Sequence, residues 1–473
     1  MTKKRSRWLV AGVGVLAAAV VAAFSSGLVR HGPAMGAGVA AQLACAGVFL
    51  MNRDVAEVKA RDVERLNPLT AMFDLTVDRT ARTVTASLFG LTSRSAYYRP
   101  GIGCTLTEGT STYELDRQVQ GLETMTLQSR TGLWPEGDDV DVEASSAGVD
   151  RTALLAAVNA AFDDPTPQKG IDTRAIVVVH DGRIVAERYA PGFDRDSRFL
   201  GWSMSKSVTG ALIGMLVEDG RLNLDAPAPV PEWREPGDPR AAITLRNMLN
   251  MASGLSFAEQ YLPGDDSTVM LFESEDMGGY AALRPLIHPP GTSWSYSSGT
   301  TNMLSRIVRD ATGGSLKSVY EYARQRLFEP AGMTSAVFQP DGSGVPIGSS
   351  FLYATARDWA RFGQLFLGEG EINGQRLLSK EWVAFSREPL AFDPMRHYGA
   401  QFWLNEGNAS AGHAPMLDRC PADMYMARGH NAQILAIVPS KRTVIVRLGW
   451  TADGHTFDEN GVFSGILAAV EKR

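Results

Sequence analysis

Residues 201–210 constrain the fold of this chain more than any other stretch. They read Gly-Trp-Ser-Met-Ser-Lys-Ser-Val-Thr-Gly, and apolar side chains then recur at three- and four-residue intervals over residues 207–219, before Gly220. This spacing predicts an amphipathic helix with the glycine as its C-cap. Ser203 and Lys206 are three residues apart, so a helix that begins near Ser203 places the hydroxyl and the amine on one face of its first turn.

This pair of side chains suits nucleophilic catalysis. A serine is a weak nucleophile at neutral pH, and a lysine whose pKa is lowered by desolvation can help to remove its proton. The helix N-terminus adds unpaired N–H groups and a positive dipole end, both suited to a developing oxyanion. Of the lysines in the chain, only Lys206 follows a serine at this spacing.

The composition excludes several other classes of protein. With 473 residues, 44% of them apolar, the chain can bury a large core and form more than one domain. A net charge of −6 without long charge runs gives no indication of a nucleic-acid partner. The 7 histidines include no H-E-x-x-H and the 3 cysteines no C-x-x-C, so neither a metal nor another cofactor is indicated.

A basic N-terminus precedes an apolar run over residues 8–29, which only Ser25 and Ser26 interrupt. The run is long enough to span a bilayer, and the basic flank predicts a cytoplasmic N-terminus with the rest of the chain exported. We therefore expect residues 1–30 to be a signal peptide or a membrane anchor. The protein is then periplasmic or otherwise extracytoplasmic, tethered to the membrane through this segment if it is not cleaved.

Export permits disulfides, and Cys45–Cys104 is the favoured one of three pairings because both residues lie near the N-terminus, which leaves Cys420 free. A second apolar stretch, residues 35–51, contains Gln42 and leads into charged helical sequence. We interpret this stretch as part of the folded protein and not as a second membrane span.

Two domains follow the N-terminal segment: a small extension over residues 31–150 and a larger domain over residues 151–473. Two hairpins are predicted near the ends of the larger domain: residues 173–180 with 183–189 around Asp181-Gly182, and residues 433–438 with 443–448. Mostly helical sequence separates them. The pattern predicts an α+β fold, in which one antiparallel sheet is built from both ends of the domain, helices flank it, and a helical lobe is inserted. A site is expected where the two lobes meet.

Three segments, in order, resemble the motifs of the serine β-lactamase and penicillin-binding-protein superfamily, in its class C-like, esterase-rich branch. Ser203-Met-Ser-Lys206 resembles the first motif, residues 289–299 the segment that carries Tyr-x-Asn, and residues 428–433 the strand that carries Lys-Thr-Gly or His-x-Gly. The resemblance covers roughly residues 165–470. The first two blocks are most similar to 6-aminohexanoate-dimer hydrolase-like proteins, which cleave short amides and esters.

The resemblance implies a β-lactamase/transpeptidase-like fold and a Ser-Lys-Tyr site. Ser203 would be the acylated nucleophile and Lys206 would help to deprotonate it. Tyr296 would act as general base and then as proton donor to the leaving group. The N–H groups of Ser203 and Gln433 would form the oxyanion hole.

Two of the motifs depart from the family pattern. Ser298 stands where an asparagine contacts the substrate amide, and His430 and Ala432 stand where the third motif has lysine and glycine. A histidine carries a weaker, pH-dependent charge, so the anchor for a substrate carboxylate is weakened unless Arg428 supplies it. Both departures favour an esterase or amidase acting on a small-molecule substrate over a β-lactamase.

Other functions stay open at this point. A D-Ala-D-Ala carboxypeptidase or a β-lactamase would suit an exported protein but needs a firm cation for the substrate. A non-catalytic binding protein on the same fold is the alternative outside enzymes, and the intact Ser203, Lys206 and Tyr296 argue against it. An α/β-hydrolase is disfavoured because residues 201–205 lack the last glycine of G-x-S-x-G.

Overall fold

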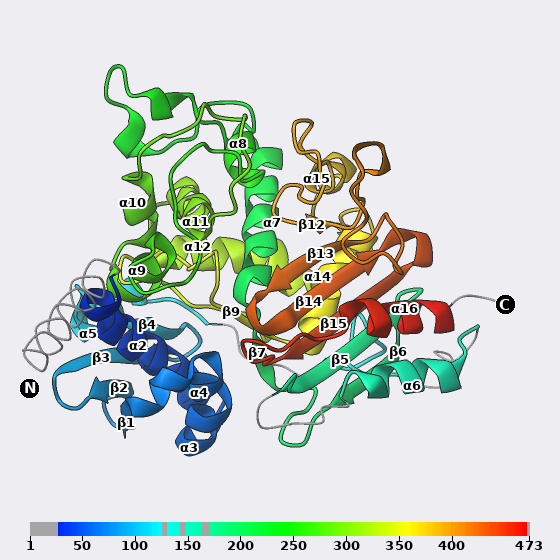
Figure 1. Ribbon diagram of the computed structural model, residues 1–473, viewed down its shortest axis with the longest axis horizontal. Helices are drawn as coiled ribbons and strands as arrows, with labels where there is room; N and C mark the ends of the chain where they lie inside the picture. The colour runs from blue at the N-terminus through cyan, green and yellow to red at the C-terminus, as the bar shows by residue number, and fades with distance from the viewer. Residues whose placement is uncertain (1–26, 125–129, 142–147, 163–169, 471–473) are drawn as a thin grey trace, which may run out of the picture.

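A six-stranded antiparallel sheet is the centre of the computed structural model, which describes residues 27–124, 130–141, 148–162 and 170–470 (Figure 1). In spatial order its strands are β12 (Trp403–Leu404), β13 (Tyr425–Gly429), β14 (Gln433–Val438), β15 (Thr443–Gly449), β5 (Thr173–His180) and β6 (Arg183–Tyr189). Strand β15 pairs with β5, so the last strands of the chain close onto the first strands of this region. The predicted α+β fold and both predicted hairpins are confirmed.

Helices cover both faces of this sheet, and strands β5, β14 and β15 are accordingly buried along their whole length. Successive side chains of a strand point to opposite faces. Val177 therefore belongs to the large core that includes α14 (Ala356–Leu367), whereas Ile176 belongs to a second core with α6 (Arg151–Ala160) and α16 (Glu459–Ala469). This layering explains why the strands are continuous apolar runs.

Helix α7 (Ser205–Glu218) runs between the sheet and the helical lobe (Figure 1). Gly220 follows it at φ 67°, a left-handed conformation that suits glycine, as the C-cap prediction requires. The lobe and its connections contain α8 (Leu245–Leu249), α9 (Asp266–Glu273), α10 (Met277–Ala282), α11 (Ser298–Thr312), α12 (Leu316–Ala323), α13 (Glu329–Ala331) and α15 (Lys380–Ser386). Three short strands, β7 (Arg198–Leu200), β9 (Leu352–Thr355) and β8 (Val337–Phe338), form a separate sheet beside α7, and β10 (Glu371–Ile372) pairs with β11 (Gln375–Arg376).

The N-terminal part is built around one long helix and a four-stranded antiparallel sheet. Its elements are α2 (Leu28–Cys45), α3 (Val55–Val58), α4 (Glu64–Leu66), a 3-10 turn (Pro68–Met72), β1 (Asp74–Asp78), β2 (Thr83–Leu88), β3 (Thr92–Arg99), β4 (Gly103–Leu106) and α5 (Thr112–Gln118). Side chains of α2 share the large hydrophobic core with α7 and α14. The N-terminal part is therefore packed into the rest of the molecule and not tethered beside it.

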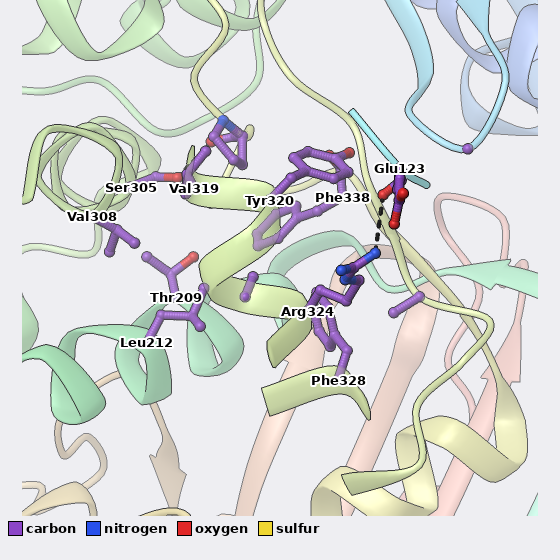
Figure 2. A pocket seen from close by; sticks show the side chains of 14 residues that line it. Glu123, Thr209, Leu212, Ser305, Val308, Val319, Tyr320, Arg324, Phe328 and Phe338 are labelled. Carbon is purple, nitrogen blue, oxygen red and sulfur yellow. Dashed lines mark hydrogen bonds between the residues drawn. The ribbon is translucent and has the colours of Figure 1, made fainter. Parts of the chain in front are cut away.

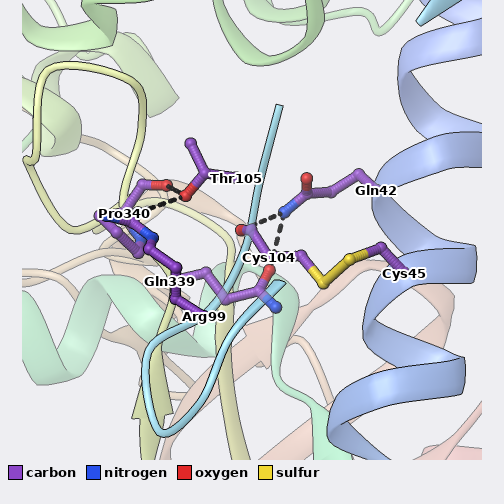
Figure 3. Close-up of a disulfide and its surroundings, with 7 residues drawn as sticks. All are labelled: Gln42, Cys45, Arg99, Cys104, Thr105, Gln339 and Pro340. Atoms are coloured by element: carbon purple, nitrogen blue, oxygen red, sulfur yellow. Dashed lines mark hydrogen bonds between the residues drawn. A yellow bond between two sulfur atoms is a disulfide. The ribbon is translucent and has the colours of Figure 1, made fainter. Parts of the chain in front are cut away.

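A disulfide and a buried glutamine fix α2 in place (Figure 3). Cys45 at the end of α2 is bonded to Cys104 in β4 and Cys420 is free, both as predicted, and the Cys420 side chain is buried. The Gln42 amide donates to the Cys104 carbonyl at 3.0 Å and to the Gln339 side chain at 2.8 Å. Helix α2 is thus joined both to its own sheet and to the loop before β9.

One helical stretch of the described chain, Val29–Leu50, is long and apolar enough to cross a membrane. Of its most apolar window, 72% is buried inside the protein, and Ala37 and Ala40 are fully buried. The interpretation of residues 35–51 as part of the folded protein is confirmed by this burial. The predicted signal or anchor, residues 8–29, lies almost entirely outside the described residues.

Candidate active site

Ser203 lies where the chain turns from strand β7 into helix α7. A 3-10 turn, Trp202–Met204, makes the connection. Trp202 has φ 47°, a left-handed conformation that costs a non-glycine residue about 1–3 kcal/mol. Backbone strain of this kind is characteristic of functional sites, and here it occurs at the residue directly before Ser203.

Lys206 is buried next to this serine, with 1% of its surface exposed. Its Nζ atom donates to Ser203 Oγ at 3.0 Å, to Ser298 Oγ at 3.0 Å and to the carbonyl of Ser349 at 3.1 Å. Burial lowers the pKa of Lys206 to about 8, while the nearby Glu259 carboxylate opposes this shift. A large part of the amine is consequently neutral at mildly alkaline pH and can accept a proton.

Tyr296 completes the cluster around the serine. Lys206 Nζ lies 4.7 Å from the centre of the Tyr296 ring, and Ser203 hydrogen-bonds the phenol. Burial raises the pKa of Tyr296, the Ser203 hydrogen bond lowers it, and the Glu259 charge raises it further, for a net increase. In the free protein this phenol is therefore protonated at neutral pH, the state that a proton donor requires.

Glu259 is a member of the cluster that the sequence did not suggest. Its carboxylate accepts from the Ser298 N–H at 2.9 Å, from the Ser298 hydroxyl and from the Tyr261 hydroxyl at 2.8 Å. The residue is on the irregular chain between α8 and α9, and no motif or periodicity marks it. A continuous chain of hydrogen bonds thus runs from Glu259 through Ser298 and Lys206 to Ser203.

The third motif approaches Ser203 from the sheet. A Cβ on Gly429 would lie 2.2 Å from the carbonyl oxygen of Gly201, so only glycine allows this approach. In the turn that follows, Asn431 has φ 57° and Ala432 has φ 61°. The left-handed conformation of Ala432 explains why the resembling motif has a glycine at this position.

His430 and Gln433 of the third motif make different contacts: the His430 side chain lines the cleft, whereas the Gln433 N–H is bonded within the turn. His430 lines the cleft, with its ring 5.8 Å from that of Trp202 and 3.9 Å from the Asp453 carboxylate. Partial loss of water lowers the pKa of His430, and Asp453 opposes that effect, so the ring is neutral at pH 7. The Gln433 N–H donates to the His430 carbonyl, and its role in an oxyanion hole stays a prediction.

Arg428 pairs with a carboxylate of the protein itself, whereas its position in the third motif suggested a role in binding a substrate carboxylate. Its guanidinium forms two hydrogen bonds with the Glu459 carboxylate, at 2.6 and 2.8 Å. Because this charge is already paired, the structure does not support Arg428 as a replacement for the lysine of the third motif.

Ser203 opens into a cleft of about 550 Å³, which we call the Ser203 cleft. Its lining includes Trp202, Tyr261 and His430 around the serine. A second pocket, between α7, α11 and α12, has a volume of only about 20 Å³, room for water but not for an organic substrate (Figure 2). Among the described residues, no group of three or more His, Cys, Asp or Glu side chains is placed to hold a metal ion.

Comparison with known proteins identifies similar sequences and structures. The family model described as Beta-lactamase matches residues 154–461. The 6-aminohexanoate-dimer hydrolase of Paenarthrobacter ureafaciens is 28% identical over 329 residues, which are 63% of this chain and 78% of that enzyme. The lovastatin esterase of Penicillium rubens is 31% identical over 164 residues, 29% of this chain and 39% of the esterase. A solved family VIII carboxylesterase superposes with a TM-score of 0.50 at 15% identity, covering 68% of this chain and 96% of that one, and shows the same fold.

Proposed function

This chain belongs to the Beta-lactamase family, and from that membership we propose that it is a serine hydrolase that cleaves esters or short amides through an acyl-enzyme. One observation carries the proposal: the buried amine of Lys206 lies 3.0 Å from Oγ of Ser203, which lines a cleft large enough for a substrate. The relatives named 6-aminohexanoate-dimer hydrolase and lovastatin esterase support the choice of amides and esters.

In the proposed reaction, neutral Lys206 takes the proton of Ser203 as the oxygen attacks the substrate carbonyl. The tetrahedral oxyanion is held by backbone N–H groups, for which we propose those of Ser203 and Gln433; the Gln433 N–H would exchange its bond to the His430 carbonyl for one to the oxyanion. The Tyr296 phenol donates its proton to the leaving group, and the proton on Lys206 then restores the phenol. Water attacks the acyl-enzyme by the reverse sequence of proton transfers and releases the acid.

This scheme assigns the base to Lys206 and not, as the family resemblance implied, to Tyr296. The lowered pKa of Lys206 and the raised pKa of Tyr296 both support the reassignment, because a base must be unprotonated in the free enzyme. Ser298 takes the place of the family's asparagine by accepting from Lys206 while it donates to Glu259.

The site is less suited to substrates with a terminal carboxylate. His430 is neutral at pH 7 and Arg428 is paired with Glu459, so neither provides a free cation at the third motif. This favours the esterase or amidase function over a D-Ala-D-Ala carboxypeptidase or a β-lactamase. A small-molecule ester or amide is therefore the proposed partner.

The proposal includes export of the enzyme, with residues 8–29 as signal or anchor. The Cys45–Cys104 disulfide supports an oxidising location, because cytosolic proteins rarely keep disulfides. The basic residues that precede the apolar run support translocation of everything after it.

Hydrolysis of p-nitrophenyl butyrate by the purified chain and by Ser203→Ala tests the proposal. We expect Ser203→Ala to lose at least about a thousandfold in kcat, since the members of a catalytic unit act together. A fluorophosphonate probe should label the parent protein and leave the variant unlabelled. Equal hydrolysis by both proteins, with both folded by circular dichroism, would contradict the assignment of Ser203.

A further inference from the structure

We propose that the N-terminal part is a component of the active site: it forms the pocket for the acyl group and makes the enzyme selective for esters and amides of long or bulky apolar acids. This inference rests on the proposed function, because it requires Ser203 to be acylated. The residues concerned precede the region that the family model matches, so the family pattern does not predict this pocket.

The Ser203 cleft is shared between two parts of the chain that are far apart in sequence. On one side are Ser203 and its neighbours. The other side, which we call the N-terminal wall, is formed by residues of α2, of the segment 66–73 and of β2; its apolar members include Met35, Val39, Leu69, Met72, Phe73 and Leu88. A volume of about 550 Å³ lies within the range of about 300–1,000 Å³ typical of pockets for drug-sized ligands.

Polar and apolar groups are separated along this cleft. Tyr261 and His430 lie beside the neighbours of Ser203, with the Tyr261 hydroxyl 3.5 Å from Ser298 Oγ and the His430 ring 5.8 Å from that of Trp202. The N-terminal wall is mainly apolar, and Leu271 and Phe272 of α9 extend it. A substrate carbonyl at Ser203 therefore has polar neighbours, and the rest of the bound group contacts hydrocarbon. Each methylene buried in such surroundings contributes about 0.8 kcal/mol, close to a fourfold gain in affinity.

The position of Tyr296 indicates which side of the scissile bond enters the cleft. Tyr296, the proposed proton donor to the leaving group, is not among the described residues that line the cleft. It packs instead against Tyr398 and Trp403, with ring centroids 5.9 and 5.3 Å away. The leaving group is expected near this aromatic cluster, so the cleft receives the acyl group.

The N-terminal wall is held at both ends of α2, as a preformed pocket requires. His31 Nδ1 near the start of the helix lies 3.1 Å from the Glu273 carboxylate at the end of α9. Gly38 lets the two helices approach closely, since a Cβ there would be 3.0 Å from Phe272 Cβ. At the other end, the Cys45–Cys104 disulfide and the Gln42 bond to Gln339 fix the helix (Figure 3). A pocket ordered in advance loses little entropy when the acyl chain binds.

The test compares kcat/KM for p-nitrophenyl octanoate and p-nitrophenyl acetate in the full chain. The variants are Leu69→Glu and Met72→Glu, which place a carboxylate in the N-terminal wall at positions 60% and 46% exposed, where the fold tolerates a charge. Leu91→Glu is the matched control, because Leu91 is 87% exposed, belongs to the same part of the chain and does not line the cleft. The ratio of the two kcat/KM values does not depend on the fraction of protein that is folded.

We expect the parent to prefer octanoate at least about tenfold, and each wall variant to reduce the ratio about tenfold, as for the loss of one or two buried methylenes. Leu91→Glu should keep the parent ratio. An unchanged ratio in both wall variants, or a parent that prefers acetate, would overturn the acyl-pocket inference. The proposed function would still hold in that case if the hydrolysis of acetate depended on Ser203. If Ser203→Ala hydrolysed both esters as fast as the parent, the proposed function would fail and this inference with it.

Discussion

Glu259 is the residue whose contacts lead most directly to a prediction. Its carboxylate accepts hydrogen bonds from the N–H and the hydroxyl of Ser298 and from the hydroxyl of Tyr261. Glu259→Gln removes the charge and keeps the shape. We expect kcat/KM to fall about ten- to a hundredfold, as for the loss of a charge-assisted hydrogen bond worth about 1.5–3 kcal/mol. The carboxylate also raises the pKa of Lys206, so its removal should move the acidic limb of the pH–activity profile to lower pH.

The control for this variant is Glu381→Gln, which neutralises an exposed carboxylate on α15. It should change neither kcat/KM nor the pH profile. A Glu259→Gln profile that coincides with that of the parent would show that the carboxylate does not act on Lys206.

The pH dependence of the parent tests Lys206 itself. The base must be neutral, and burial lowers the pKa of Lys206 to about 8, so kcat/KM should rise with pH through a midpoint near 8. At pH 6 the rate should be about a hundredfold below the plateau. This pH is about two units below the midpoint, and each unit reduces the fraction of neutral Lys206 about tenfold. Initial rates from pH 5.5 to 9.5, corrected for buffer hydrolysis, measure this; a flat profile would exclude Lys206 as the base.

Among the structural elements, α2 depends most on a covalent link. The Cys45–Cys104 disulfide closes a loop with a sequence separation of 59, worth about 4 kcal/mol in the chain-entropy model. The double variant Cys45→Ser/Cys104→Ser should therefore have a clearly lower Tm and, with α2 less fixed, a lower octanoate-to-acetate ratio. Cys420→Ser removes a thiol but no disulfide, and it should change both quantities much less. Equal Tm values for the parent and the double variant would show that the disulfide does not secure this helix.

For the whole molecule, the elements with strong local signals were predictable. The Asp181-Gly182 turn located the hairpin of β5 and β6, and the serine–lysine spacing located the start of α7. Glu259 was not predictable, because its role depends on where an irregular loop packs. For the same reason no local pattern brings Met35 to the cleft of Ser203: the contact exists only after α2 has packed against α9.

The closure of the sheet by both ends of its region also determines when the protein can finish folding. Strand β5 obtains its central partner only when β15 is available, and His180 is separated from Thr443 by 263 residues. Contacts of such long range fold slowly, since the chain loses loop entropy before they form. A chain that ends before residue 443 would leave the apolar edge of β5 without β15, and such an edge is prone to pair with other molecules. Strand β15 must therefore be synthesised before this sheet can close.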